Sequence, residues 1–235
     1  MTVGMPTEEN PVVVVEGDCL DVLRALPDGC VDAVVTDPPY NVGFGYEGDT
    51  SRDRKSDYWW WCGSWFSELK RVCRGPILIS CGVANIGMWY SIQSPSWVLC
   101  WHKPAAMGRC AVGFNNWEPV LLYGKGLRPS CDVFQAVIIP DSSLDGHPCP
   151  KPLMWARRQL QAVPDAAVIL DPFAGSGTTG VAAIAEGRKA ILIEKEPKYA
   201  AICRRRVAEA MGLGKGSLLA ALQPSLFPEL SLIHI

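Results

Sequence analysis

Short apolar runs alternate along the chain with longer stretches in which apolar residues recur every three or four positions. Apolar runs of about four to six residues are typical of buried strands, and the longer spacing is typical of amphipathic helices. The alternation predicts βαβ units and therefore an α/β fold with a mostly parallel sheet. The predicted strands are residues 12–15, 33–36, 77–80, 97–101, 119–123, 167–170 and 190–193. The predicted helices are 19–25, 57–73, 151–162, 178–186 and 197–211.

Three residues suit the ends of these helices. Asp57 is expected to cap the second helix, because its carboxylate can accept from a free backbone N–H. Pro197 suits the first turn of the last helix, and Gly212 suits its C-terminal end. The aromatic run 59–61 is expected to begin a buried amphipathic helix.

The length of 235 residues suits one domain, expected over residues 1–211. We expect an N-terminal half over about 12–125 and a C-terminal half over about 147–211. Residues 103–147 are rich in Pro and Gly, which predicts an irregular insertion with one or two strands. Residues 212–235 are expected to form a tail.

Composition narrows the class of protein. Hydrophobic residues make up 49% and charged residues 20% of the chain, and no apolar stretch is long enough to predict a membrane span. The first ten residues lack the features of a secretion signal, so a cytoplasmic location is expected. Ten cysteines without a Cys-x-x-Cys pair, beside only three histidines, predict reduced structural thiols and no metal site.

Charge is distributed unevenly, although the net charge is only −2. Residues 1–50 hold ten acidic residues against one arginine, whereas residues 51–130 hold ten Lys and Arg against four acidic residues. A polarised chain can present a basic face to nucleic acid while staying nearly neutral overall. On charge alone, a surface of scattered solvated charges remains an alternative.

The first motif with chemical content is Asp37-Pro38-Pro39-Tyr40, directly after the predicted strand 33–36. The two prolines forbid a helix, so the chain turns rigidly where a parallel strand ends. Ligands bind at that edge of an α/β sheet. The turn offers a carboxylate, backbone carbonyls and an aromatic face, which are the groups needed to hold the amino group of a planar base.

The second motif runs from the strand 167–170 into Asp171-Pro-Phe173-Ala-Gly175-Ser-Gly177-Thr178-Thr-Gly180. Its glycines allow a ligand to approach the backbone, and the following helix leaves N–H groups free. Glu194 ends the next strand, where a carboxylate can accept both ribose hydroxyls of a nucleoside cofactor.

Two ligands compete for this loop. The spacing of its glycines matches the dinucleotide fingerprint, so a nicotinamide oxidoreductase stays open, whereas the absence of Gly-Lys-Ser/Thr excludes a P-loop. Asp171 would repel a pyrophosphate but attract the sulfonium and ammonium of S-adenosylmethionine. Charge therefore favours S-adenosylmethionine.

Together the two motifs resemble the DNA amino-methyltransferases, in the permuted order of their beta group, where the catalytic motif comes first. Residues 16–20 resemble the segment whose acid binds the adenine of the cofactor, and 117–125 resemble a late strand of the catalytic half. Residues 147–152 resemble the His-Pro-x-x-Lys-Pro segment that cups its methionine end. The resemblance covers residues 12–211 and implies a Rossmann-like, S-adenosylmethionine-dependent fold. That fold has a mostly parallel, seven-stranded sheet with helices on both faces.

The resemblance implies three sets of site residues. The catalytic residues are Asp37, Pro38, Pro39 and Tyr40. The cofactor-binding residues are Asp18, Cys19, Lys151, Asp171, Phe173, Gly175, Gly177, Thr178 and Glu194. The candidate DNA-binding residues are Arg52, Arg54, Lys55, Lys103, Arg109, Lys125 and Arg128. The dipeptide Pro148-Cys149 is similar to the nucleophile of cytosine C5 methyltransferases, but it lies within the His-Pro-x-x-Lys-Pro match and is assigned no catalytic role.

The expected reaction is methylation of an exocyclic amino group in DNA. Asp37 and the Pro38 carbonyl would accept its two N–H groups, Tyr40 would stack on the base, and the base would be flipped out of the duplex. Asp-Pro-Pro-Tyr is commoner in adenine-specific members of the family, so adenine N6 is favoured over cytosine N4. RNA or protein-glutamine methylation, a non-catalytic nucleic-acid-binding module and a homodimer remain open. A bacterial or phage-borne modification enzyme is the expected setting, with or without a restriction partner.

Overall fold

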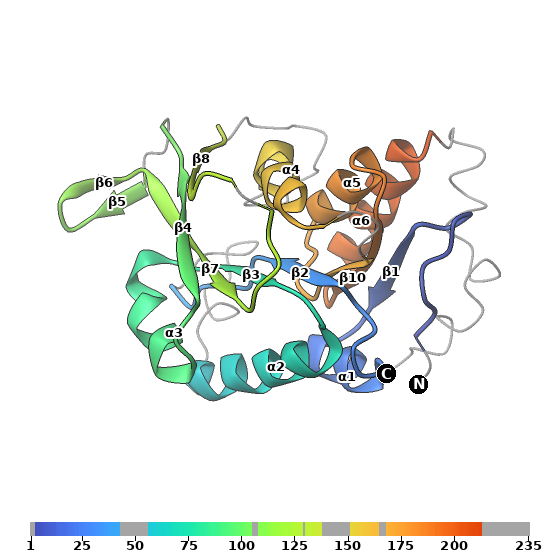
Figure 1. Ribbon diagram of the computed structural model, residues 1–235, viewed down its shortest axis with the longest axis horizontal. Helices are drawn as coiled ribbons and strands as arrows, with labels where there is room; N and C mark the ends of the chain where they lie inside the picture. Colours follow the sequence, from blue (N-terminus) through green and yellow to red (C-terminus); the bar gives the residue numbers. More distant parts are fainter. Residues whose placement is uncertain are drawn as a thin grey trace.

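The computed structural model describes residues 3–42, 56–104, 108–128, 130–137, 151–164 and 168–212. An eight-stranded sheet lies at its centre, in the order β1-β10-β9-β2-β3-β7-β4-β8 (Figure 1). Its strands are β1 (Val12–Glu16), β2 (Ala33–Thr36), β3 (Ile77–Ser80), β4 (Trp97–His102), β7 (Trp117–Tyr123), β8 (Val133–Gln135), β9 (Val168–Asp171) and β10 (Lys189–Glu194). Strand β7 runs antiparallel to both of its neighbours, and the other strands run parallel to one another.

The α/β fold is therefore confirmed, but the described sheet has eight strands where seven were predicted. The additional strand, β8, pairs with β4 at the edge of the sheet. Only Phe134 is buried in its three residues, so its apolar signal is too short to be recognised in the sequence. Each predicted strand is present, with ends shifted by at most two residues within the described part of the chain.

Helices cover both faces of the sheet (Figure 1). One face carries α1 (Cys19–Ala25), α2 (Tyr58–Val72) and α3 (Ile86–Ile92), which is preceded by the short 3-10 helix η2 (Val83–Asn85). The other face carries α4 (Leu153–Ala162), α5 (Thr178–Ala185) and α6 (Pro197–Ala210). A small hairpin of β5 (Gly108–Cys110) and β6 (Gly113–Asn115) projects from the body of the domain between β4 and β7.

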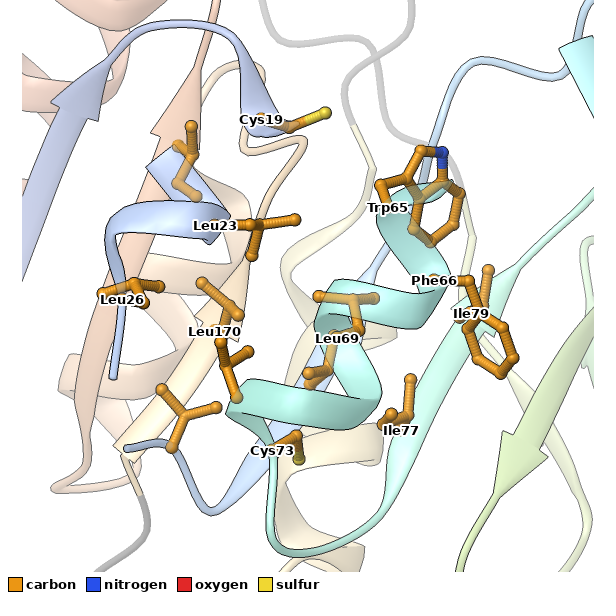
Figure 2. Close-up of a cluster of buried hydrophobic side chains, with 14 of the residues drawn as sticks. Cys19, Leu23, Leu26, Trp65, Phe66, Leu69, Cys73, Ile77, Ile79 and Leu170 are labelled. Carbon is orange, nitrogen blue, oxygen red and sulfur yellow. The ribbon is translucent and has the colours of Figure 1, made fainter. Parts of the chain in front are cut away.

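Each face of the sheet has its own apolar core, because alternate side chains of a strand point to opposite faces. In β1, Val13 and Val15 belong to the core under α1 and α2, whereas Val12 and Val14 belong to the core under α5 and α6. Figure 2 shows the first core, where side chains of α1 and α2 point toward each other over the strands. These two cores fix the carboxyl ends of the parallel strands at one edge, called here the C-terminal edge of the sheet.

One of four local predictions is wrong. Asp57 occupies the N-cap position of α2, but its side chain makes no capping hydrogen bond. The aromatic run does begin an amphipathic helix with a buried face, although Trp59 is 41% and Trp60 71% exposed, and the fully buried ring is that of Trp65. Pro197 does stand in the first turn of α6, and Gly212 follows it with a left-handed φ of 73°.

Among the helices of the described residues, none has the length and apolar character required to cross a membrane. The nine cysteines within the described residues are free thiols, and Cys149 lies outside those residues. No cluster of three or more His, Cys, Asp or Glu within the described part of the chain could hold a metal ion.

Candidate active site

The two motifs meet at the C-terminal edge of the sheet. Strands β2 and β9 are neighbours, with Val34 opposite Leu170, so the chain leaves both strands at the same place. The Thr36 hydroxyl donates to Asp171 Oδ1 at 2.8 Å, which joins the end of β2 directly to the glycine loop. The expected catalytic turn and the expected cofactor loop therefore lie side by side.

The carboxylate of Asp37 is held by two neighbours. The Tyr40 hydroxyl lies 2.5 Å from Oδ1, and Lys151 Nζ lies 3.1 Å from Oδ2. Burial raises the pKa of Asp37, the ammonium of Lys151 opposes that rise, and the negative charge of Glu118 adds to it. Tyr40 and Lys151 thus hold the carboxylate in one orientation as an acceptor, and the charges of Lys151 and Glu118 influence whether it is ionised.

The turn itself is fixed by bonds to its backbone. Tyr58 donates its hydroxyl to the Pro39 carbonyl at 2.7 Å, and Asn85 Nδ2 donates to the Tyr40 carbonyl at 2.6 Å. Asn41 then reverses the chain with a left-handed φ of 59°. No hydrogen bond between described residues engages the Pro38 carbonyl, which therefore remains an acceptor at the turn.

Glu118 lies in this site although the sequence analysis did not name it. It lies at the start of β7, and its side chain is 14% exposed. Oε2 lies 3.0 Å from Lys151 Nζ, and Oε1 pairs with Lys103. Burial raises the pKa of Glu118, but the two ammonium groups outweigh burial and hold that pKa below its ordinary value. The signal available in the sequence was an acid at the start of an otherwise apolar strand.

Asp171 is 3% exposed, and its oxygens accept three hydrogen bonds. Besides Thr36, the donors are the Phe173 N–H at 3.1 Å and the Thr179 hydroxyl at 2.6 Å. Burial raises the pKa of Asp171 to about 6, although these donors oppose the rise. The group is therefore a buried anion at neutral pH, as a site for a cation requires.

The glycine loop packs closely against α6 and carries Glu194 beside it. Gly177 has a φ of 82°, and a Cβ there would lie 2.7 Å from Cys203 Sγ, so this position requires a glycine. Glu194 Oε2 accepts from the Gly175 N–H and Oε1 from the Glu196 N–H, each at 2.8 Å. Each oxygen keeps a lone pair for a hydroxyl donor. The two acceptor oxygens of Glu194 therefore fit the hydroxyls of a ribose.

The remaining residues expected at the cofactor surround this loop. The Gly17 N–H donates to the Glu194 carbonyl at 3.0 Å, which brings Asp18 next to the end of β10. Asp18 caps α1, and the Thr178 hydroxyl donates to the Lys151 carbonyl at 3.2 Å. Phe173 packs between Trp61 and Trp65, with ring centroids 5.5 and 5.1 Å away.

Arg206 of α6 was also missed. One of its terminal nitrogens donates to the Ser176 carbonyl at 2.7 Å and lies 3.3 Å from the Thr178 hydroxyl. The guanidinium of Arg206 therefore holds the backbone of the glycine loop in place.

Cys19 is buried, and burial together with Asp18 raises the pKa of its thiol to about 12, so the thiol stays protonated.

The basic residues expected to contact DNA do not form one group. Lys103 is 7% exposed and paired with Glu118, so a phosphate contact for it does not agree with the structure. Arg109 lies on the exposed hairpin, which joins the ends of β4 and β7 at the C-terminal edge. Lys125 and Arg128 follow the end of the antiparallel strand β7 and lie at the opposite edge. Arg52, Arg54 and Lys55 lie outside the described residues.

Comparison with known proteins agrees with this geometry. The family model of the N6/N4 DNA methylases matches residues 31–129 and 128–205. YubD of Escherichia coli K12, which bears the name of a methylase, is 30% identical over 213 residues, covering 83% of this chain and 89% of its own.

Solved structures share the fold. The cytosine-N4-specific PvuII DNA methyltransferase superposes with a TM-score of 0.69 at 16% identity, covering 93% of this chain and 94% of its own. The M1.HpyAVI complex with S-adenosylmethionine gives a TM-score of 0.63 at 20% identity, covering 83% and 98%. The match to the family model spans both halves of the site described above, and the chain therefore belongs to the N6/N4 DNA methylase family.

Proposed function

We propose that this chain transfers a methyl group from S-adenosylmethionine to the 6-amino group of adenine in DNA. The observation that carries the proposal is the hydrogen bond from Thr36 to Asp171, which places the Asp37-Pro38 turn beside the glycine loop. A group that grips an amino nitrogen thereby stands next to a loop built for a cationic nucleoside.

The catalytic turn acts by positioning. The amino nitrogen of adenine is a poor nucleophile, because its lone pair is delocalised into the ring. Asp37 and the Pro38 carbonyl accept its two N–H groups, which draws the nitrogen toward a tetrahedral geometry and restores density to the lone pair. Oriented, charge-assisted acceptors of this kind supply most of the acceleration.

The cofactor residues divide by the part of S-adenosylmethionine that they face. Glu194 takes the ribose, Asp18 and Cys19 the adenine, and Asp171 and Lys151 the methionine end. Gly175, Gly177, Phe173 and Thr178 form the loop around it. When bound, the cofactor supplies an electrophilic methyl group on a sulfonium.

The target base has to leave the duplex, which costs a few kcal/mol. Contacts to the DNA backbone offset that cost. The exposed hairpin that carries Arg109 projects from the C-terminal edge, on the side of the catalytic turn, and is the described element best placed to supply them (Figure 1). Tyr40 offers the face of its ring to the flipped base.

Cytosine N4 is the second candidate. Its amino group also stands beside a ring nitrogen, so the same acceptor pair suits it. The acid in Asp37-Pro38-Pro39-Tyr40 favours adenine by resemblance to the adenine-specific members. The cytosine-specific neighbour shares only 16% identity and therefore bears on the fold alone.

Nucleoside analysis tests the proposal. Amplified DNA, which carries no methylation, is incubated with the protein and S-adenosylmethionine, digested to nucleosides and measured by mass spectrometry. N6-methyldeoxyadenosine is the expected product. If N4-methyldeoxycytidine is found instead, the target base is cytosine and not adenine. Methylation of RNA or of a glutamine peptide, with none on DNA, would overturn the substrate class. Methylation-aware sequencing of the same DNA gives the sequence context.

A further inference from the structure

Both groups that hold Asp37 also contact Glu118. The Tyr40 hydroxyl lies 2.5 Å from Asp37 Oδ1 and 3.1 Å from Glu118 Oε2. Lys151 Nζ lies 3.1 Å from Asp37 Oδ2 and 3.0 Å from the same Glu118 oxygen. One atom of Glu118 is therefore a second acceptor for every side chain that the described structure places on the Asp37 carboxylate.

Glu118 is itself held in place from the other side. Lys103, at the end of β4, pairs with Oε1, and its ammonium lies 5.2 Å from the ring centroid of Trp101. Trp101 stands opposite Glu118 in the register of β4 and β7. The side chains of Lys103 and Glu118 are only 9% and 14% exposed, so the pair is well shielded from water.

Binding of a base adds a further donor to the Asp37 carboxylate. Oδ1 already accepts from Tyr40 and Oδ2 is paired with Lys151, so an incoming amino group shares one of these oxygens with the donor already present. Weakening the bond between a buried ammonium or hydroxyl and its acceptor costs free energy unless another acceptor compensates for the loss. With Glu118 within reach, Lys151 and Tyr40 keep a partner when they release Asp37.

We propose that Glu118 is a positioning residue that takes over the Tyr40 hydroxyl and the Lys151 ammonium when Asp37 accepts the target amino group. Lys103 holds Glu118 ready for this exchange. The inference rests on the proposed methylation of DNA, and it assigns to Lys103 a place inside the site instead of on a phosphate.

The exchange is testable through the pH dependence of a single turnover. The charged and titratable groups around Asp37 are Tyr40, Cys81, Lys103, Glu118, Lys151 and Asp171. In wild type, the rate of methyl transfer to amplified DNA falls on the acid side as Asp37 is protonated. In Glu118→Gln the anion that opposes ionisation of Asp37 is gone, so this acid limb moves to lower pH.

The plateau rate of Glu118→Gln also falls, by about tenfold, because Lys151 and Tyr40 then compete with the base for Asp37. Glu118→Asp keeps the charge and returns the acid limb toward its wild-type position. The matched control is Glu68→Gln on α2, which also removes the charge of a partly buried, ion-paired glutamate and leaves limb and plateau unchanged. If Glu118→Gln does not fold, the double variant Lys103→Met/Glu118→Gln is measured in its place, because it removes one charge of each sign and leaves no unpaired ammonium at residue 103.

Each outcome decides the matter. The exchange is supported if Glu118→Gln lowers the plateau rate and moves the acid-side fall in rate to lower pH, and if Glu118→Asp moves that fall back toward its wild-type pH. A lower plateau without a shift makes Glu118 a packing residue and overturns the inference, while DNA methylation by wild type still stands. A wild-type protein that methylates no DNA rejects the proposed function, and the exchange falls with it.

Discussion

At the scale of single residues, Asp171 shows how burial and function meet. Its carboxylate is 3% exposed, yet no ammonium or guanidinium within the described residues pairs with it, and its oxygens accept only from two threonines and a backbone N–H. Neutral donors do not fully replace the water that a carboxylate loses. The raised pKa, about 6, is the result. In the proposed complex, the cation of the cofactor offsets this electrostatic penalty.

This cost predicts a pH-dependent stability. Between the ordinary pKa of 3.8 and the folded value of about 6, the folded protein binds more protons than the unfolded chain, so Asp171 lowers the free energy of unfolding as pH rises. The variant Asp171→Asn has no carboxyl group at this position, so its free energy of unfolding lacks this dependence on pH. The stability of the variant relative to wild type should therefore rise by up to about 3 kcal/mol from pH 4 to pH 7.

Urea unfolding of both proteins at several pH values between 4 and 7 measures this difference. Parallel pH profiles for wild type and Asp171→Asn would show that the buried carboxylate carries no such penalty. The same variant should bind S-adenosylmethionine more weakly in calorimetry, because the cation then faces a neutral amide.

The sequence predicts some of these residues and not others, for a physical reason. Asp37, Asp171 and Glu194 each follow or end an apolar strand, and the end of a strand can be read locally. Glu118 and Lys103 acquire their roles from each other, across the pairing of β4 with β7, and local pattern does not encode which charges become neighbours. For the same reason Lys103 was mistaken for a surface cation.

At the scale of elements, the β5–β6 hairpin is an exposed structure inserted between β4 and β7. Val112 at its turn is 93% exposed, and Arg109 lies 5.9 Å from the ring centroid of Phe114. The hairpin leaves the sheet between Lys103 and Glu118, whose ion pair closes its base. Its position is thus tied to the site, although its surface is free to contact a partner.

Arg109→Ala should weaken DNA binding by about tenfold and lower the salt dependence by about one counterion, because one phosphate contact is lost. Lys125→Ala is the control, since Lys125 follows the end of β7 at the opposite edge and should change neither quantity. Fluorescence anisotropy with a duplex oligonucleotide at several salt concentrations measures both. Equal losses in the two variants would remove the hairpin from the interface.

Elements were predicted from the sequence where their apolar runs are long and regular. Among the helices that cover the sheet, α1, α2, α4, α5 and α6 were predicted with ends shifted by at most two residues. The elements α3, β5, β6 and β8 were not predicted by position, because each is short and most of its side chains are exposed or half-buried. Their structure comes from packing against neighbours instead of from their own periodicity.

At the scale of the whole molecule, the order of strands creates the site. Strands β9 and β2 are adjacent in the sheet but far apart in the sequence, and each supplies one acid at the C-terminal edge. β7 runs against them, so that its first residues, including Glu118, reach the same edge. The sequence motifs identify the residues in the two halves of the site, whereas the strand order of the sheet brings these two halves into contact.

The central claim is that Asp37 prepares the amino nitrogen for methyl transfer. The most direct measurement is the single-turnover rate of Asp37→Ala on amplified DNA, with calorimetry of S-adenosylmethionine binding and anisotropy of DNA binding on the same preparation. The account predicts a rate at least about a hundredfold below wild type with both affinities nearly unchanged, whereas the exposed-acid control Asp28→Ala keeps the wild-type rate. A near-native rate from an Asp37→Ala protein that binds cofactor and DNA normally would contradict it.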